Sequence, residues 1–123
     1  MANPSTEGGS GAGTEVLRRG YIDGLSNTDT PILTGAANHI YTVLSVIFCE
    51  RDASTTEKVH MYVDADLAGS NIYLLRHQVV GADATFIWND RFVITETDKL
   101  YVTSVTSANF DVWISYIDQQ FAA

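Results

Sequence analysis

Apolar and polar residues alternate along much of this chain with a period of two. In the run from Lys58 to Asp64, three apolar residues, Val59, Met61 and Val63, are separated by polar or amphipathic ones. The run 110–117 repeats the pattern, with apolar residues at every even position. Alternation of this kind is typical of a β-strand that has one face on a core and the other in water. The pattern predicts strands that line one shared core.

Eight such runs follow one another, separated by short clusters of Gly, Asn, Asp, Ser and Thr that favour turns. The predicted strands are Val16–Ile22, Pro31–Leu33, Ile40–Cys49, Lys58–Asp64, Asn71–Val79, Thr85–Thr95, Leu100–Val105 and Phe110–Ile117. β-Branched and aromatic residues dominate these runs, and helical periodicity is hard to find. The sequence therefore predicts an all-β antiparallel sandwich.

The run 40–49 is apolar on both of its faces. We expect Ile40, Leu44, Val46 and Phe48 on one side and Tyr41, Val43 and Ile47 on the other. A strand with two apolar faces is covered twice, once by its own core and once by a partner subunit, a loop or the N-terminal segment folded back.

The first fourteen residues differ from the rest of the chain. They hold four glycines, at positions 8, 9, 11 and 13, and no periodic apolar positions, which predicts a flexible arm. They also lack the basic start and the apolar stretch of a secretion signal, so we expect no export by that route. The predicted organisation is an N-terminal arm over 1–14 and one β-sandwich domain over 15–123.

Composition narrows the classes of partner. The chain has 7 Lys and Arg against 15 Asp and Glu, a net charge of −8. Nucleic-acid binding depends on clustered cations, so a nucleic-acid partner is not expected. No apolar run approaches the roughly 20 residues of a membrane-spanning helix, so a membrane partner is not expected either.

The residue types that act in catalysis or metal binding in other proteins form no such pattern in this sequence. His39, His60 and His77 are scattered without ligand spacing, and the single cysteine, Cys49, is predicted to be a small core residue. The run from Asp64 to Gly69 begins like a calcium loop but lacks two of its oxygen donors. Nucleophile and phosphate-loop motifs are absent. We therefore predict a protein that is not an enzyme, with no catalytic residues, metal or cofactor.

Two aromatic residues stand on the polar sides of their predicted strands. They are Tyr62 and Trp113, and we expect them to contact a partner. Sugar-binding sandwiches stack ligands on such rings, so a carbohydrate-binding module that uses one of these two residues is an alternative.

Several stretches resemble a known class of protein. They are Thr14-Glu-Val-Leu-Arg-Arg-Gly-Tyr-Ile-Asp-Gly-Leu, Ile40-Tyr-Thr-Val-Leu-Ser-Val-Ile-Phe-Cys-Glu, Asp98-Lys-Leu-Tyr-Val-Thr-Ser and Phe110-Asp-Val-Trp-Ile-Ser-Tyr-Ile. Together they resemble small β-sandwich virion proteins of tailed bacteriophages, most of all those that decorate or cement the capsid. The resemblance implies a jelly-roll-like antiparallel sandwich with an extended N-terminal arm that reaches an adjacent subunit.

The same resemblance implies a function without turnover. The chain would sit on the outer capsid surface of the virion, assembled in the host bacterial cytoplasm, often as a trimer, and bridge neighbouring major capsid subunits. The negative charge suits a position outside the shell, away from packaged DNA. Our candidate residues for the partner interface are Arg18, Arg19, Tyr21, Tyr62 and Trp113. A tail or fibre-associated virion module of the same architecture is the alternative.

Overall fold

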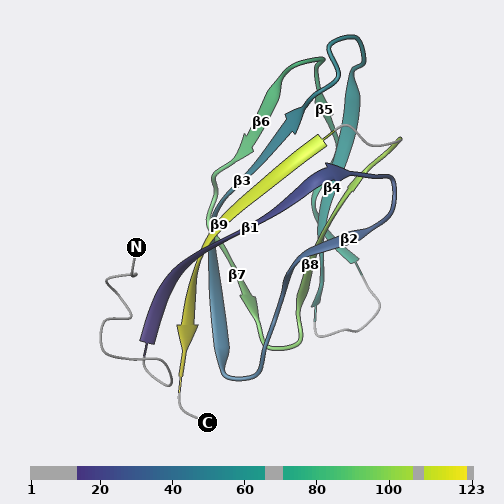
Figure 1. Ribbon diagram of the computed structural model, residues 1–123. Helices are drawn as coiled ribbons and strands as arrows, with labels where there is room; N and C mark the ends of the chain where they lie inside the picture. The colour runs from purple at the N-terminus through teal and green to yellow at the C-terminus, as the bar shows by residue number, and fades with distance from the viewer. Residues whose placement is uncertain (1–13, 66–70, 107–109, 122–123) are drawn as a thin grey trace.

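Two antiparallel sheets, stacked face to face, make up the fold (Figure 1). The computed structural model describes residues 14–65, 71–106 and 110–121. The first sheet has the order β1-β9-β3-β6, and β7 pairs with β3 beyond the end of β6; the second has the order β2-β8-β4-β5. The strands are β1 (Thr14–Leu25), β2 (Thr30–Thr34), β3 (His39–Glu50), β4 (Glu57–Asp64), β5 (Asn71–Val80), β6 (Thr85–Trp88), β7 (Phe92–Thr95), β8 (Lys99–Ser104) and β9 (Phe110–Gln120).

The path of the chain between the sheets defines the topology. Only β4 and β5, and β6 and β7, follow each other within one sheet; every other connection crosses to the opposite sheet. The first strand, β1, pairs along its length with the last strand, β9. This strand order is that of a jelly roll, so the all-β sandwich and its jelly-roll character, both predicted from the sequence, are confirmed. The predicted arm over 1–14 falls almost entirely outside the described residues.

The core lies between the sheets, where their inner faces meet. The predicted alternation is confirmed in β4, where Val59 and Met61 are fully buried, and in β9, where Val112 and Ile114 are buried. The largest fully buried apolar side chains are Phe48, Phe110, Leu25, Met61, Ile94, Leu100 and Ile114. They come from both sheets, so neither sheet is stable without the other.

A β-bulge in β3 changes which of its residues face the core. The register with β9 shifts between Val43 and Ser45, so that Leu44 is an extra residue. Tyr41, Val43, Val46 and Phe48 therefore face the core, and the predicted grouping of Ile40 and Leu44 with Val46 and Phe48 is wrong. A strict period of two cannot anticipate this, because one extra residue exchanges the two faces of everything after it.

The predicted strand Thr85–Thr95 is two strands, which corrects the sequence interpretation. Residues 85–88 pair with the second half of β3, and residues 92–95 pair with its first half. The three residues between them lie beside the bulge, where β3 offers no regular ladder, and the indole Nε1 of Trp88 donates to the backbone carbonyl of Asp90 at 2.7 Å. The interruption of this edge and the bulge in β3 therefore lie at the same level of the sheet.

We predict that Gly35 is required where β2 meets the turn before β8. Its N–H donates to the carbonyl of Asp98 at 2.8 Å, and a Cβ at position 35 would meet the carbonyl group of Glu96 and lie 2.9 Å from that of Asp98. Because backbone has to move to make room, Gly35→Ala should lower the free energy of unfolding by about 1–3 kcal/mol in urea titrations.

Gly81→Ala is the matched control for that substitution. A Cβ at position 81 meets nothing closer than Ala84 at 3.8 Å, which is an ordinary contact. It should leave stability unchanged or raise it by about 0.4–1 kcal/mol through the unfolded state. Equal effects of the two substitutions would contradict the predicted clash.

Candidate protein-binding face

The outer face of the first sheet carries three successive rows of side chains across its strands. The register aligns Leu17, Ile117, Thr42 and Val93 in one row, Arg19, Ser115 and Ser45 in the next, and Tyr21, Trp113, Ile47 and Ile87 in the third. We call these three rows the apolar face. Side chains of alternate residues point to the same side of a sheet, so the rows follow directly from the pairing.

The apolar face holds half of the exposed large hydrophobic residues of the described chain. Five of ten lie on it, namely Leu17, Tyr21, Ile87, Val93 and Trp113, with exposed fractions from 43% to 61%. The charged residue within its rows is the cation Arg19, whereas the chain as a whole has 15 Asp and Glu residues. Two apolar rows that flank a polar row, on an otherwise acidic protein, are typical of a protein-interaction site.

Arg19, Tyr21 and Trp113 form a cluster on this face. The rings of Tyr21 and Trp113 stack at 17°, with their centres 5.9 Å apart. The guanidinium carbon of Arg19 lies 5.4 Å from the centre of the Tyr21 ring and 5.1 Å from that of Trp113, so the cation contacts both π-systems. The cluster holds three long side chains in place before any partner arrives, which lowers the entropic cost of binding.

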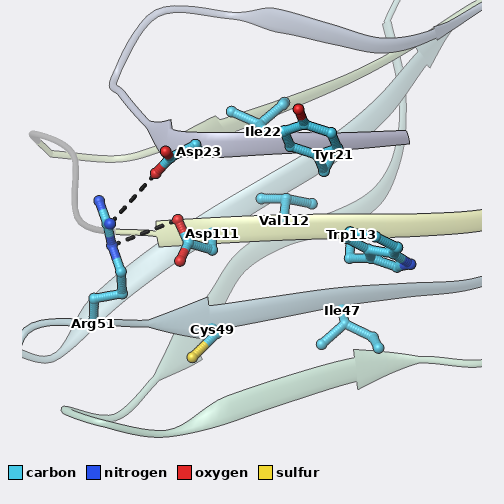
Figure 2. Close-up of a pocket in the computed structure, with 9 residues that line it drawn as sticks. All are labelled: Tyr21, Ile22, Asp23, Ile47, Cys49, Arg51, Asp111, Val112 and Trp113. Atoms are coloured by element: carbon cyan, nitrogen blue, oxygen red, sulfur yellow. Dashed lines mark hydrogen bonds and ion pairs between the residues drawn. The ribbon is translucent and has the colours of Figure 1, made fainter. Parts of the chain in front are cut away.

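A shallow pocket of about 480 Å³ opens where the third row meets the end of the sheet (Figure 2). Tyr21, Trp113 and Ile47 form its apolar side. At its other side Arg51 pairs with Asp23 at 3.4 Å and with Asp111 at 3.5 Å. The pocket therefore joins an apolar surface to a charged rim, as protein interfaces do.

Cys49 lies on the outer face and lines this pocket, so the prediction that it is a core residue is wrong. Alternation places Cys49 on the opposite side from its buried neighbour Phe48, and the bulge in β3 places it opposite the buried Tyr41 and Val43 as well. The thiol is half-buried.

Two of the five predicted interface residues do not join the apolar face. Arg18 points to the opposite side of β1 from Arg19, and its Nε donates to Asp118 at 2.9 Å. The same carboxylate, nearly buried, contacts Nδ1 of His39 at 2.6 Å. Arg18 is thus engaged within its own chain, although half of its side chain is exposed.

Tyr62 lies on the outer face of the second sheet, yet it is only 4% exposed, so the expectation of a water-facing ring there is wrong. Tyr73 and Tyr101 are its cross-strand neighbours, with ring centres 5.2 Å away on each side, and they cover it. Burial raises the pKa of Tyr62 far above its ordinary range, and the carboxylate of Asp29 adds to the increase. A role of Tyr62 in a partner contact stays a prediction.

Eight members of the apolar face were not predicted from the sequence as interface residues, and they include Leu17, Ile47, Ile87 and Val93. The outward facing of Leu17 follows from its alternation with Tyr21, and that of Ile87 follows from its place between the apolar, partly buried Phe86 and Trp88. Ile47 and Val93 could not, because their facing depends on the bulge in β3 and on the interruption between β6 and β7.

In the described part of the chain, no group of three or more His, Cys, Asp or Glu side chains could hold a metal ion. Asp66 and Gly69 of the run that begins like a calcium loop lie outside the described residues. None of the described segments is a helix long and apolar enough to span a membrane.

Comparison with known proteins identifies the fold. No protein-family model matches the chain, and no curated protein sequence matches it. Among solved structures, a subunit of Bacillus endospore appendages, described as a family of disulfide-linked pili, is 16% identical, with 99% of this chain and 96% of that chain covered and a TM-score of 0.51. A capsid protein of Helicobacter pylori bacteriophage KHP30 is 8% identical, with 85% and 86% covered and a TM-score of 0.49.

A pentameric capsid protein from metagenomic phage sequences is 15% identical over 98% of this chain and 68% of its own, with a TM-score of 0.43. At these identities the similarity is one of fold. The class defined by fold and face together is a jelly-roll sandwich with exposed apolar residues on its first sheet, similar in fold to the Bacillus appendage subunit.

The imidazole of His60 is partly buried on the second sheet and accepts a backbone hydrogen bond. The backbone N–H of His77, which has a left-handed φ of 55°, donates to Nδ1 of His60 at 3.1 Å, and the two rings lie 4.6 Å apart. Burial lowers the pKa of His60, and the nearby His77 and Arg76 lower it further, while Asp29 acts in the opposite direction.

We predict that stability falls as the pH drops below about 6.5, the ordinary pKa of the unfolded imidazole. The unfolded state then binds a proton that the folded state resists, and a protonated Nδ1 can no longer accept the His77 bond. In His60→Asn the amide oxygen can still accept that bond without titrating. Urea titrations at pH 7.5 and 5.5 should show a smaller loss of stability for His60→Asn than for the wild type. Equal losses would contradict the prediction.

Proposed function

We propose that this chain is a structural subunit that acts by adhesion, as a decoration protein that attaches to a bacteriophage capsid and bridges neighbouring major capsid subunits. The observation that supports this most is the apolar face, because an exposed surface with a preformed Arg–Tyr–Trp cluster is suited to burial against protein. Tyr, Trp and Arg are the residues that contribute most to binding at protein interfaces.

Cementing would follow from repetition and not from one strong contact. Each copy would bury a modest area across a boundary between shell subunits, and it would have to lose several contacts before leaving. Part of the apolar face could serve contacts among copies of the chain, with a trimer expected from the resemblance to cement proteins, and the arm over residues 1–14 would reach an adjacent subunit.

The alternative of a carbohydrate platform has less support from the site geometry. The ring faces of Tyr21 and Trp113 contact each other and the Arg19 guanidinium, so less open ring surface is available to a sugar. Glycan-array binding that is abolished by Trp113→Ala would favour that alternative. A tail or fibre-associated module differs in copy number, which is few per virion instead of many.

We predict that virions lacking this protein release their DNA at a lower temperature, or after milder osmotic shock, than complete virions, because fewer contacts join the shell subunits. Adding purified wild-type protein should restore the resistance. Trp113→Ala should bind such particles at least roughly tenfold more weakly, since it removes a central aromatic residue of the face. Thermal DNA release and quantitative pelleting with particles measure the two effects.

Val79→Ala is the control, because Val79 is 52% exposed on the second sheet, away from the apolar face. It should bind particles like the wild type. Depleted particles that are as robust as complete ones would exclude the cementing role, and a few copies per virion by quantitative mass spectrometry would favour the tail module.

A further inference from the structure

We propose that the outer face of the second sheet carries an oxyanion site, formed by Arg76 and His60 and flanked by Lys58, and that its ligand is an acidic saccharide. The site lies on β4 and β5, on the opposite side of the sandwich from the apolar face. It goes beyond the proposed function and uses none of the residues on which that function rests.

A β-bulge in β5 brings the polar groups of the site together. The register with β4 shifts there, so that Arg76 and His77 together stand opposite the single residue His60. Both side chains lie on the outer face. The ring of His77 is 4.6 Å from that of His60, and the guanidinium carbon of Arg76 is 4.9 Å from the centre of the Tyr73 ring. A regular strand would direct two consecutive side chains to opposite faces, so the bulge is what gathers them.

The backbone of His77 fixes which nitrogen of His60 is a donor. His77 has a φ of 55°, which is uncommon for a residue other than glycine, and its N–H donates to Nδ1 of His60 at 3.1 Å. A neutral imidazole that accepts at Nδ1 carries its proton on Nε2. Burial lowers the pKa of His60, and His77 and Arg76 lower it further, which favours this neutral ring. Nε2 of His60 is therefore a hydrogen-bond donor beside the guanidinium of Arg76.

The site is a local excess of positive charge on an acidic protein. Arg76 and Lys58 are exposed, and Lys58 lies two residues before His60 on the same face of β4. In the part of the chain that the structure describes, neither cation forms an ion pair with a carboxylate. This is unusual in a chain with 15 Asp and Glu against 7 Lys and Arg. A guanidinium with a neighbouring N–H donor is suited to an oxyanion.

The carboxylate of Asp29 indicates what the anion is attached to. Asp29 accepts a hydrogen bond from the Tyr62 hydroxyl, and its charge partly offsets the lowering of the pKa of His60 by burial. A carboxylate this close to the cations disfavours a compact dianion such as phosphate, but it can accept hydrogen bonds from hydroxyl groups. A sugar that carries one carboxylate beside several hydroxyls fits both parts of the site. The ring of Tyr73, which is 39% exposed, offers its C–H groups an apolar contact.

Titration of the full-length, ¹⁵N-labelled protein with sodium D-glucuronate at constant ionic strength, followed by NMR, tests the site. Glucuronate should shift amide signals within residues 58–62 and 73–78 in a saturable way, and D-glucose should not. Arg76→Gln should weaken the binding at least roughly tenfold, because it removes a charged donor. Arg91→Gln is the matched control and should bind like the wild type, since Arg91 is exposed between β6 and β7 of the other sheet.

Two substitutions at His60 separate the roles of its two nitrogens. The amide of an asparagine reaches the position of Nδ1 and can still accept from the N–H of His77, but it leaves no donor at the position of Nε2. The amide of a glutamine reaches the position of Nε2 and loses the His77 bond. His60→Gln should therefore bind glucuronate more tightly than His60→Asn, although it is the less stable of the two. A purely structural role of His60 gives the opposite order.

Several outcomes would overturn the proposal. They are the absence of a saturable shift with glucuronate, equal binding of glucose, equal or tighter binding of acetate or inorganic phosphate, and the opposite order of the two His60 variants. Arg76→Gln leaves the apolar face intact, so it should pellet with particles like the wild type. Loss of glucuronate binding and loss of particle binding are thus separate results, and each bears on one proposal alone.

Discussion

The pairing of β3 with its neighbours is the constraint on which the rest of this structure depends. β3 lies inside the first sheet and pairs with β9 on one side and with β6 and β7 on the other. Its bulge at Leu44 lets both halves of the strand bury apolar side chains, since Tyr41 and Val43 precede it and Val46 and Phe48 follow it. Without the extra residue, one half would turn its core residues to the outside.

The same bulge shapes the outside of the sheet. It directs Ile47 outward into line with Trp113, and it coincides with the break that separates β6 from β7. The first and third rows of the apolar face therefore pass unbroken over β1, β9 and β3. The first row ends at Val93 on β7, and the third ends at Ile87 on β6. Core packing and the surface proposed for assembly are thus two consequences of one register, and a change in the register would alter both.

The two outer sheet faces differ in how their aromatic residues are arranged. On the first sheet, Tyr21 and Trp113 remain about half exposed and are covered in part by Arg19. On the second, Tyr62 is buried between Tyr73 and Tyr101, and the ring of His60 lies against that of Tyr73. The first face offers area for a partner, whereas the aromatic residues of the second largely cover one another.

The sequence by itself determined the all-β class, the position of most strands and the inner residues of β4 and β9, because a pleated strand with one wet face imposes a period of two. It also singled out Arg19, Tyr21 and Trp113. Only the tertiary structure decided that these three meet, that Arg18 and Tyr62 do not join them, and that Cys49 faces outward. Those outcomes depend on which strands pair and where the register shifts, and pairing between residues up to about a hundred positions apart has no local signal in the chain.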